Sequence, residues 1–124
     1  MAAYLNDRVF DNGLTVLDTE ADKLYITSSQ ATTYTEAITT YALGVKNTPT
    51  VSAPADRSGG GREVTVSAIT DGSVTGNGTA GFYAMVDSAN TRLLAAGPLD
   101  TTQGVTSGNT FTLTSFKIGI PDPA

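Results

Sequence analysis

The chain has 124 residues and a formal net charge of −5, and it contains neither cysteine nor histidine. The absence of these two side chains excludes disulfide bonds, thiolate nucleophiles, the common zinc sites and every mechanism that uses imidazole as a base, and the scattered Lys and Arg residues argue against a nucleic-acid partner. The threonine- and glycine-rich composition favours a mainly β protein, and the length fits a single domain over residues 1–124.

The first residues, MAAYLNDRVFDNG, have neither the basic start nor the apolar middle of a signal peptide, so we expect no export by that route. Leu5, Val9 and Phe10 do not keep one period. This irregularity predicts a strand or an extended, irregular N-terminal arm over residues 1–14. Because the longest apolar run of the chain is far below membrane-spanning length, we expect no membrane partner.

Carboxylates gather early in the chain: they are Asp7, Asp11, Asp18, Glu20 and Asp22. Alternating acidic residues can supply oxygen ligands for Ca²⁺. The run lacks the loop glycine and the distal glutamate of an EF-hand, which favours a solvated turn over a metal site. With 12 acidic residues in the chain, no pair is specifically indicated as a glycosidase pair. We therefore expect no metal and no cofactor.

A strand and then a helix are predicted next. DKLYITSS, residues 22–29, places Leu24 and Ile26 on one face, as in a strand. TTYTEAITTYALG, residues 32–44, predicts one short helix, because four of its side chains recur at helical spacing: they are Tyr34, Ala37, Ile38 and Tyr41. A threonine three or four residues before the glutamate resembles a capping box, and Gly44 is placed to close the helix.

Residues 47–62, NTPTVSAPADRSGGGR, are rich in proline and glycine and predict a long loop. Val51 is expected in a short edge strand whose extent is limited by Pro49 and Pro54. The run RSGGGRE lacks both the Gly-Lys-Ser/Thr ending and the following helix of a phosphate-binding loop. We therefore expect a flexible hairpin or tip loop here.

The stretch REVTVSAI, residues 62–69, alternates strictly and predicts a strand with Val64, Val66 and Ala68 facing inward. The next residues, TDGSVTGNG, are dense in turn formers. They include two dipeptides that favour tight hairpins: these are Asp71-Gly72 and Asn77-Gly78. We expect hairpin turns at these positions.

TAGFYAMVD, residues 79–87, has apolar side chains on both faces, which predicts a central strand or a strand whose outer face is covered. The sequence SANT then predicts a turn, and RLLAAG is expected to pair back with the preceding strand. This spacing is typical of a β-meander within a sandwich.

Along the last stretch, Phe111 and Leu113 follow one phase of alternation, and Phe116 and Ile118 follow the other. A sheet accommodates such a slip with a bulge or with a strand that bends into a second sheet. We expect the last strand to turn this corner before Pro121 ends the pairing. The fold class predicted is mainly β: a single antiparallel β-sandwich or β-barrel-like domain with an irregular N-terminal arm and at most one short helix.

No constellation of residues indicates catalysis, because the hydroxyl groups lack an activating base, and we expect that the protein is not an enzyme. Tyrosine gives a large contact area with few rotatable bonds, so tyrosines and their apolar neighbours are the candidate protein-interface residues. These are Tyr4, Leu5, Phe10, Tyr34 and Tyr41. The alternative is that these side chains pack the arm and the helix onto the sandwich.

Three segments, YLNDRVFDNGLTVLDTEADKLYITSSQATTYTEA, GFYAMVDSANTRLLAAGPL and VTSGNTFTLTSFKIGIP, resemble small structural proteins of tailed bacteriophages and prophages. The resemblance implies a virion component, in the first place a capsid decoration (cement) protein that binds the outer surface of the head and stabilises it. It also implies the major capsid protein or other virion proteins as partners, and self-association, with a trimer as the expected homo-oligomer. The expected location is the virion, assembled in the host cytoplasm.

Two alternatives remain open at this point. A tail-tube, head–tail connector or fibre-base subunit would assemble into rings or tubes and would use residues 47–62 as a hairpin that reaches a neighbour. A carbohydrate-binding or host-surface-binding module would need exposed aromatic platforms, and the chain has no tryptophan.

Overall fold

The computed structural model describes residues 6–121, without the side chains of residues 7–10. The elements in chain order are α1 (Asp7–Thr19), β1 (Lys23–Thr27), the π-helix η1 (Glu36–Thr40), β2 (Ala42–Asn47), β3 (Ala55–Asp56), β4 (Arg62–Val66), β5 (Ile69–Val74), β6 (Gly78–Asp87), β7 (Arg92–Val105), β8 (Thr110–Leu113) and β9 (Phe116–Ile120). Every strand pairing among them is antiparallel. The predicted mainly β, antiparallel fold is confirmed.

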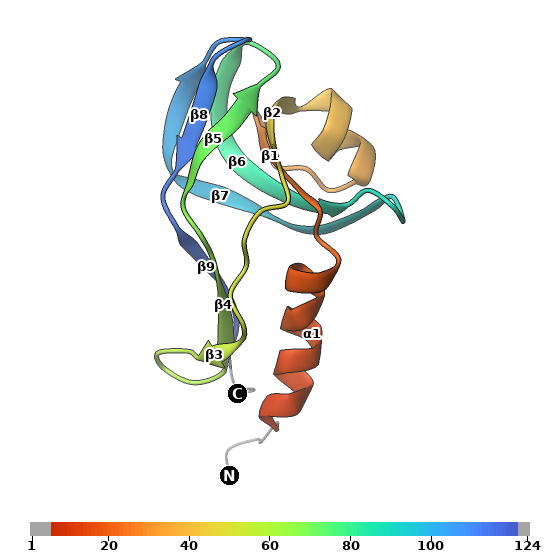
Figure 1. Ribbon diagram of the computed structural model, residues 1–124, viewed down its shortest axis with the longest axis vertical. Coiled ribbons are helices and arrows are strands. Elements are labelled where there is room, and N and C mark those ends of the chain that lie inside the picture. Colours follow the sequence, from red (N-terminus) through yellow and green to blue (C-terminus); the bar gives the residue numbers. More distant parts are fainter. Residues whose placement is uncertain (1–5, 122–124) are drawn as a thin grey trace.

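The strands form two sheets (Figure 1). Six strands make a curled sheet in the order β7-β6-β1-β2-β5-β8, and β3-β4-β9 make a small sheet that extends beside α1. The chain crosses between the sheets three times, from β2 to β3, from β4 to β5 and from β8 to β9. The last crossing lies where the phase of alternation slips, just before Phe116, so the predicted corner of the last strand is confirmed.

The crossing from β4 to β5 corrects the strand predicted over residues 62–69. Val64 and Val66 are buried as expected, but Ala68 is exposed and Ile69 is buried instead. The link at Ser67 and Ala68 shifts the phase by one residue, because β4 and β5 belong to different sheets.

The prediction of an irregular N-terminal arm over residues 1–14 is wrong from Asp7 onward, where the helix α1 begins; residues 1–5 lie outside the described residues. Residues 6–121 therefore contain two helical elements instead of at most one. Leu14, Leu17 and Ala21 are buried at helical spacing, and this period starts beyond the residues on which the prediction depended. An ion pair from Arg62 Nε to an oxygen of Asp11, at 2.9 Å, ties α1 to β4.

The helix predicted over residues 32–44 is present in a shorter form that ends at Thr40. The bonds expected of a capping box are divided between two threonines before η1: the backbone N–H of Glu36 donates to Thr33 Oγ1 at 3.1 Å, and the Glu36 carboxylate accepts the backbone N–H of Thr32 at 2.9 Å. Gly44 does not close the helix. It lies buried inside β2, where a Cβ atom would come within 2.7 Å of the Ser73 carbonyl oxygen.

The two predicted hairpin turns are both wrong. Gly72 lies inside β5, where a Cβ atom would come within 2.3 Å of the Phe111 ring, so this glycine permits close packing instead of a turn. Asn77 and Gly78 do connect β5 to β6, but β1 and β2 lie between those strands in the sheet. A turn-forming dipeptide thus indicates that the chain changes direction, but it does not determine which strands pair.

Residues 47–62, the Pro- and Gly-rich stretch predicted as a long loop, contain more strand pairing than a loop would have. Val51 forms an isolated bridge to Val66, as expected for a short edge strand. β3 and β4 form a hairpin, and its tip contains Gly59, Gly60 and Gly61 at φ values of 88°, 108° and 93°. Glycine adopts this left-handed region without strain, so the predicted glycine hairpin is confirmed.

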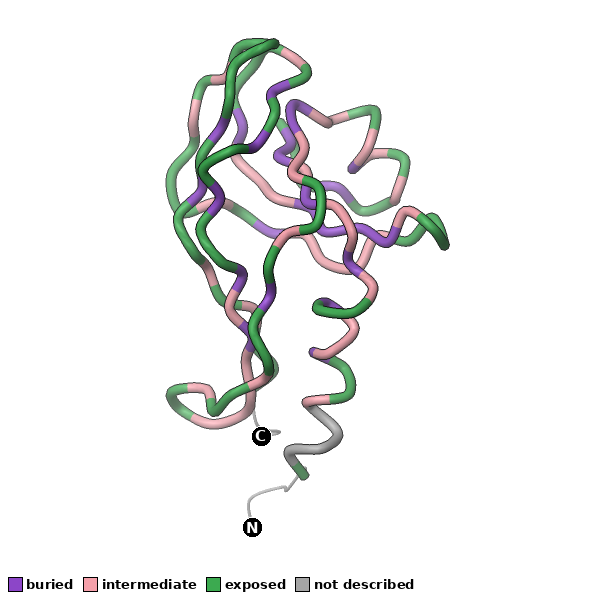
Figure 2. The backbone as a smooth tube through the Cα atoms, viewed as in Figure 1, coloured by how far each residue is buried: buried purple, intermediate pink, exposed green. Residues whose placement is uncertain are grey.

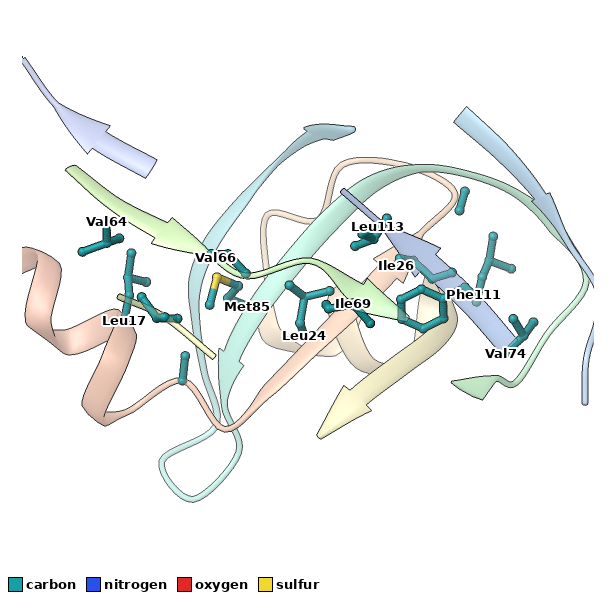
Figure 3. Packing of buried hydrophobic residues seen from close by; sticks show 14 of the residues in the cluster. Leu17, Leu24, Ile26, Val64, Val66, Ile69, Val74, Met85, Phe111 and Leu113 are labelled. Carbon is teal, nitrogen blue, oxygen red and sulfur yellow. The ribbon is translucent and has the colours of Figure 1, made fainter. Parts of the chain in front are cut away.

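The main hydrophobic core joins α1 to both sheets (Figures 2 and 3). Figure 3 places Leu17 and Val64 at one end and Phe111 with Val74 at the other. A second, smaller cluster includes Ala37 of η1 and lies on the opposite face of β6, so β6 is covered on both faces, as predicted for a central strand. Among residues 6–121, neither helix has the length and apolar character needed to cross a bilayer.

Candidate functional site: the seam between β7 and β8

β7 and β8 follow one another in the chain but do not pair. They are joined by a turn over residues 106–109, in which the backbone N–H of Asn109 donates to the carbonyl oxygen of Thr106 at 3.1 Å. A short turn of this kind normally connects two strands that are hydrogen-bonded to each other as a hairpin. Here β7 and β8 are instead the first and the last strand of the six-stranded sheet, as far as the chain is described.

The turn is bonded to its neighbours, and this holds β8 away from β7. The Gly108 N–H donates to the Val74 carbonyl at 3.0 Å, and the Val74 N–H donates to the Asn109 carbonyl at 2.9 Å. The Ser107 N–H also donates to Asn77 Oδ1 at 2.8 Å. β8 consequently continues the ladder of β5, and its other edge has no partner strand within residues 6–121.

One side chain bridges the gap. In a closed hairpin about this turn, Val105 would face Thr110 and Gln103 would face Thr112. Instead, Gln103 Nε2 donates to the Thr112 carbonyl oxygen at 2.9 Å. The Gln103 side chain and its hydrogen bond together span more than about 4.8 Å, the usual distance between two paired strands. β7 and β8 are therefore farther apart here than strands that pair. We call the gap between residues 98–103 and 112–116 the seam; the two strands run side by side at the edge of the curled sheet in Figure 1.

β7 bulges along one wall of the seam. Phe82 of β6 pairs with Pro98, and Ala80 pairs with Gln103. The single residue Gly81 therefore lies opposite the four residues 99–102, which have no partner on β6. A bulge of this kind bends its strand and commonly ends regular pairing, and proline at its start lacks the N–H of a ladder.

The seam contains a cavity of about 170 Å³. Its apolar lining comes from Tyr83, Leu99, Leu113 and Phe116. The rings of Tyr83 and Phe116 lie 4.5 Å apart between centroids, with an interplanar angle of 38°. Gly97 leaves room for the first of these rings, because a Cβ atom there would come within 3.1 Å of the Tyr83 hydroxyl oxygen. The cavity is thus a small cleft between two strand edges, with an apolar wall and a polar one.

Polar groups surround this cleft. Burial raises the pKa of the Tyr83 phenol, whose hydroxyl makes no hydrogen bond within residues 6–121. Asp100 is exposed, lines the cavity and has no ion-pair partner among the described residues. No Lys or Arg lines the cavity, so the described lining carries a single negative charge.

The sequence-predicted interface residues lie elsewhere or outside the description. Tyr4 and Leu5 are outside the described residues, and so is the side chain of Phe10, whose backbone belongs to α1. Tyr34 and Tyr41 flank η1 and are half-buried, and Tyr34 packs against the second hydrophobic cluster. Neither of them lines the seam. Their role in an interface stays a prediction.

The early carboxylates are dispersed over separate contacts. Arg92 approaches Glu20 at 3.7 Å. Asp22 accepts hydrogen bonds from the hydroxyl and, at 2.9 Å, from the backbone N–H of Ser88, and these bonds hold the pKa of that carboxyl below its ordinary value. Within residues 6–121, no three acidic residues gather in a way that could hold a metal ion.

Sequence reasoning missed the seam, although two of its causes are visible in the sequence. The turn TSGN, residues 106–109, has alternating strand patterns on both sides, which is a hairpin pattern. Pro98 interrupts the pattern on one side and the phase slip before Phe116 interrupts it on the other. These two interruptions lie about equally far from the turn in the sequence. A hairpin pattern that is interrupted on both strands in this way could have indicated that the two strands separate.

Comparisons of the chain with protein-family models, with curated proteins and with solved structures found no match. The function proposed below is therefore based on the seam and on the resemblance in sequence.

Proposed function

We propose that the protein is a structural component of a tailed-phage or prophage virion, in the first place a capsid decoration protein that binds the outer surface of the head and stabilises it. The observation that carries the proposal is the seam, which offers two strand edges without a partner strand in the part of the chain that the structure describes, and a small cleft with an apolar wall. Such edges are a ready template for binding another chain. The resemblance supports the same assignment, because GFYAMVDSANTRLLAAGPL and VTSGNTFTLTSFKIGIP, two of the segments that carry it, both contribute residues to the lining of the seam.

The size of the seam suits a decoration protein. A cleft of about 170 Å³ gives a modest contact. On a shell, many equivalent modest contacts add up, because neighbouring copies and local symmetry raise the effective concentration of each site. A trimer would place three seams around one symmetry axis of the particle.

The chemistry of the seam favours binding over catalysis. Among the residues lining the cavity, Asp100 is the one carboxylate, and no Lys or Arg stands beside the hydroxyl groups to activate one as a nucleophile. The proposal assigns the protein no catalytic role.

Quantitative mass spectrometry of purified particles tests the proposal by giving the copy number of this protein relative to the major capsid protein. A fixed ratio of many copies to capsid subunits is the expected result. A handful of copies per particle would transfer the assignment to a connector or fibre base. Its absence from particles would end the virion assignment, and light scattering of the free protein checks the trimer separately.

A further inference from the structure

We infer that the seam binds an extended segment of a partner chain, which enters between β7 and β8 as an added strand, places one apolar side chain in the cavity and places a Lys or Arg beside Asp100. For the identity of the partner, a subunit of the virion shell, the inference depends on the proposed function. The binding chemistry itself depends on the geometry alone.

The walls of the seam offer main-chain groups to an added strand. Among the described strands, β7 pairs on one side only, with β6, and β8 pairs on one side only, with β5, and Thr114 and Ser115 lie outside the strands. About the turn at residues 106–109, these two walls run antiparallel, with Leu99 opposite Phe116. An extended segment between them can pair with either edge, which is how peptides add to an exposed sheet edge.

The cavity sets the size of the side chain that anchors the segment. Its volume of about 170 Å³ is close to that of apolar cavities that accept benzene, near 150 Å³. One Phe, Leu or Ile side chain fills such a space. The rings of Tyr83 and Phe116 provide an apolar wall for it, and the free Tyr83 hydroxyl can donate to a carbonyl of the entering chain.

Charge selects among apolar segments. Asp100 is the single charge of the cavity lining, it has no partner within residues 6–121, and the whole chain carries a net charge of −5. A segment with a cation next to its anchor complements this surface, and one with an added acid is repelled. The occupant is therefore an extended segment with one large apolar residue flanked by Lys or Arg.

A peptide titration tests the inference with the full chain. The probe is a blocked peptide of sequence TVKTFTKVT, in which a Lys lies two residues from the Phe anchor on the same strand face, and its binding is followed by NMR signals of the protein; the control peptide TVETFTEVT carries acids in place of the lysines. We expect shifts confined to the residues around Tyr83, Leu99 and Phe116, with the control peptide binding about fivefold more weakly. Absence of shifts at millimolar peptide, or shifts centred on another surface, overturns the inference.

Two matched pairs of variants locate the binding. Asp100→Lys reverses the charge in the seam, whereas Asp18→Lys makes the same change at an exposed position of α1. Thr101→Trp fills the cavity, whereas Thr102→Trp adds the same side chain at the next residue, which does not line it. We expect Asp100→Lys to lose the preference for the cationic peptide and Thr101→Trp to lose binding, with both controls like wild type. Equal effects within either pair overturn the inference, and thermal unfolding confirms that all four variants fold.

The same variants on purified particles separate the two proposals. If the wild-type protein binds particles and Thr101→Trp binds equally well, the strand insertion is wrong while the decoration function stands. If the wild-type protein does not bind particles but binds the peptide, the seam is a peptide site and the decoration function is wrong. Peptide-independent self-association that Thr101→Trp abolishes would assign the seam to a second copy and overturn the inference.

Discussion

The chain contains two successive hairpin connections, and one closes while the other stays open. β6 and β7 meet at the turn of residues 88–91, and Asp87 pairs directly with Arg92 across it. β7 and β8 meet at the turn of residues 106–109, and they separate at once. The two turns have the same length, so turn length does not determine whether the flanking strands pair with each other.

The difference lies in the partners of each turn. In the closed turn, the buried carboxylate of the flanking residue Asp87 accepts hydrogen bonds from the backbone N–H of Asn90 at 3.4 Å and from its side-chain amide at 2.8 Å. The bonds of this turn to another segment run from Ser88 to Asp22, just before β1, and β1 itself pairs with β6. The open turn is bonded to Val74 of β5 and to Asn77, and β5 keeps β8 in its own ladder. A hairpin therefore opens when a neighbouring strand competes for the backbone groups of its turn, as β5 does here.

The largest expected effect comes from removing the side chain that anchors β8 to β5. Phe111 is buried, and its ring packs directly on Gly72. We expect Phe111→Ala to lower the free energy of unfolding by about 4 kcal/mol, because it removes apolar contacts and leaves a cavity. Chemical denaturation measures the change. The exposed neighbour Thr112→Ala is the control, and a loss of similar size in both variants would contradict the anchoring role of Phe111.

A second change compares the two turns directly. We expect Asn90→Ala to cost about 2 kcal/mol, because it removes the side-chain partner of a buried carboxylate, that of Asp87. Asn109→Ala in the open turn should cost much less, because the hydrogen bonds of Asn109 in the described structure come from its backbone. Denaturant unfolding of both variants measures the difference. Equal costs would show that the two turns are held in the same way and would remove the distinction drawn above.

A smaller effect is expected at the bridge across the seam. Gln103→Ala removes the hydrogen bond to the Thr112 carbonyl, and we expect a cost of about 1 kcal/mol in stability. Hydrogen exchange should become faster at the free edges of β7 and β8 and should stay unchanged in β1. Unchanged exchange along the seam would mean that Gln103 does not control its opening.

Alternation along the strands predicted much of the sheet architecture. Leu24 and Ile26 are buried on β1 as expected, and the phase slip before Phe116 located the crossing into the small sheet. These features are local, because burial on one face of a strand determines every second residue. Because alternation is a local pattern, the sequence predicted the strands on both sides of the seam. It did not predict that these strands fail to pair.

The errors share a physical cause, which is competition with distant residues. Asp71-Gly72 carries a turn signal, yet Gly72 is needed inside β5 to admit the Phe111 ring. α1 contains Asn12 and Gly13, which are weak helix formers, and packing of Leu14 against the sheets stabilises the helix nonetheless. The open hairpin likewise depends on bonds to Val74, which no pattern near residues 106–109 reveals.

The smallest expected effect concerns pH at the closed turn. Because hydrogen bonds from Ser88 lower the pKa of Asp22 in the folded protein, the ionised carboxylate stabilises the fold above about pH 4, and this stabilisation is lost as the pH falls through the folded value. Ser88→Ala removes the hydroxyl bond and keeps the backbone bond. We expect a cost of about 1 kcal/mol at neutral pH that narrows below pH 4 as Asp22 takes up a proton.

Thermal unfolding of Ser88→Ala between pH 7 and pH 2.5 measures this change, with Ser107→Ala in the open turn as the matched control. Ser107 contributes its backbone N–H to the open turn, so its variant should follow the wild-type curve at every pH. If the two serine variants instead gave parallel curves, the pH sensitivity would not belong to the closed turn. A gap that narrows for Ser88→Ala alone would show that the closed hairpin is linked to the start of β1 through the ionised Asp22, whereas the described bonds of the open turn, to Val74 and Asn77, involve no titratable group.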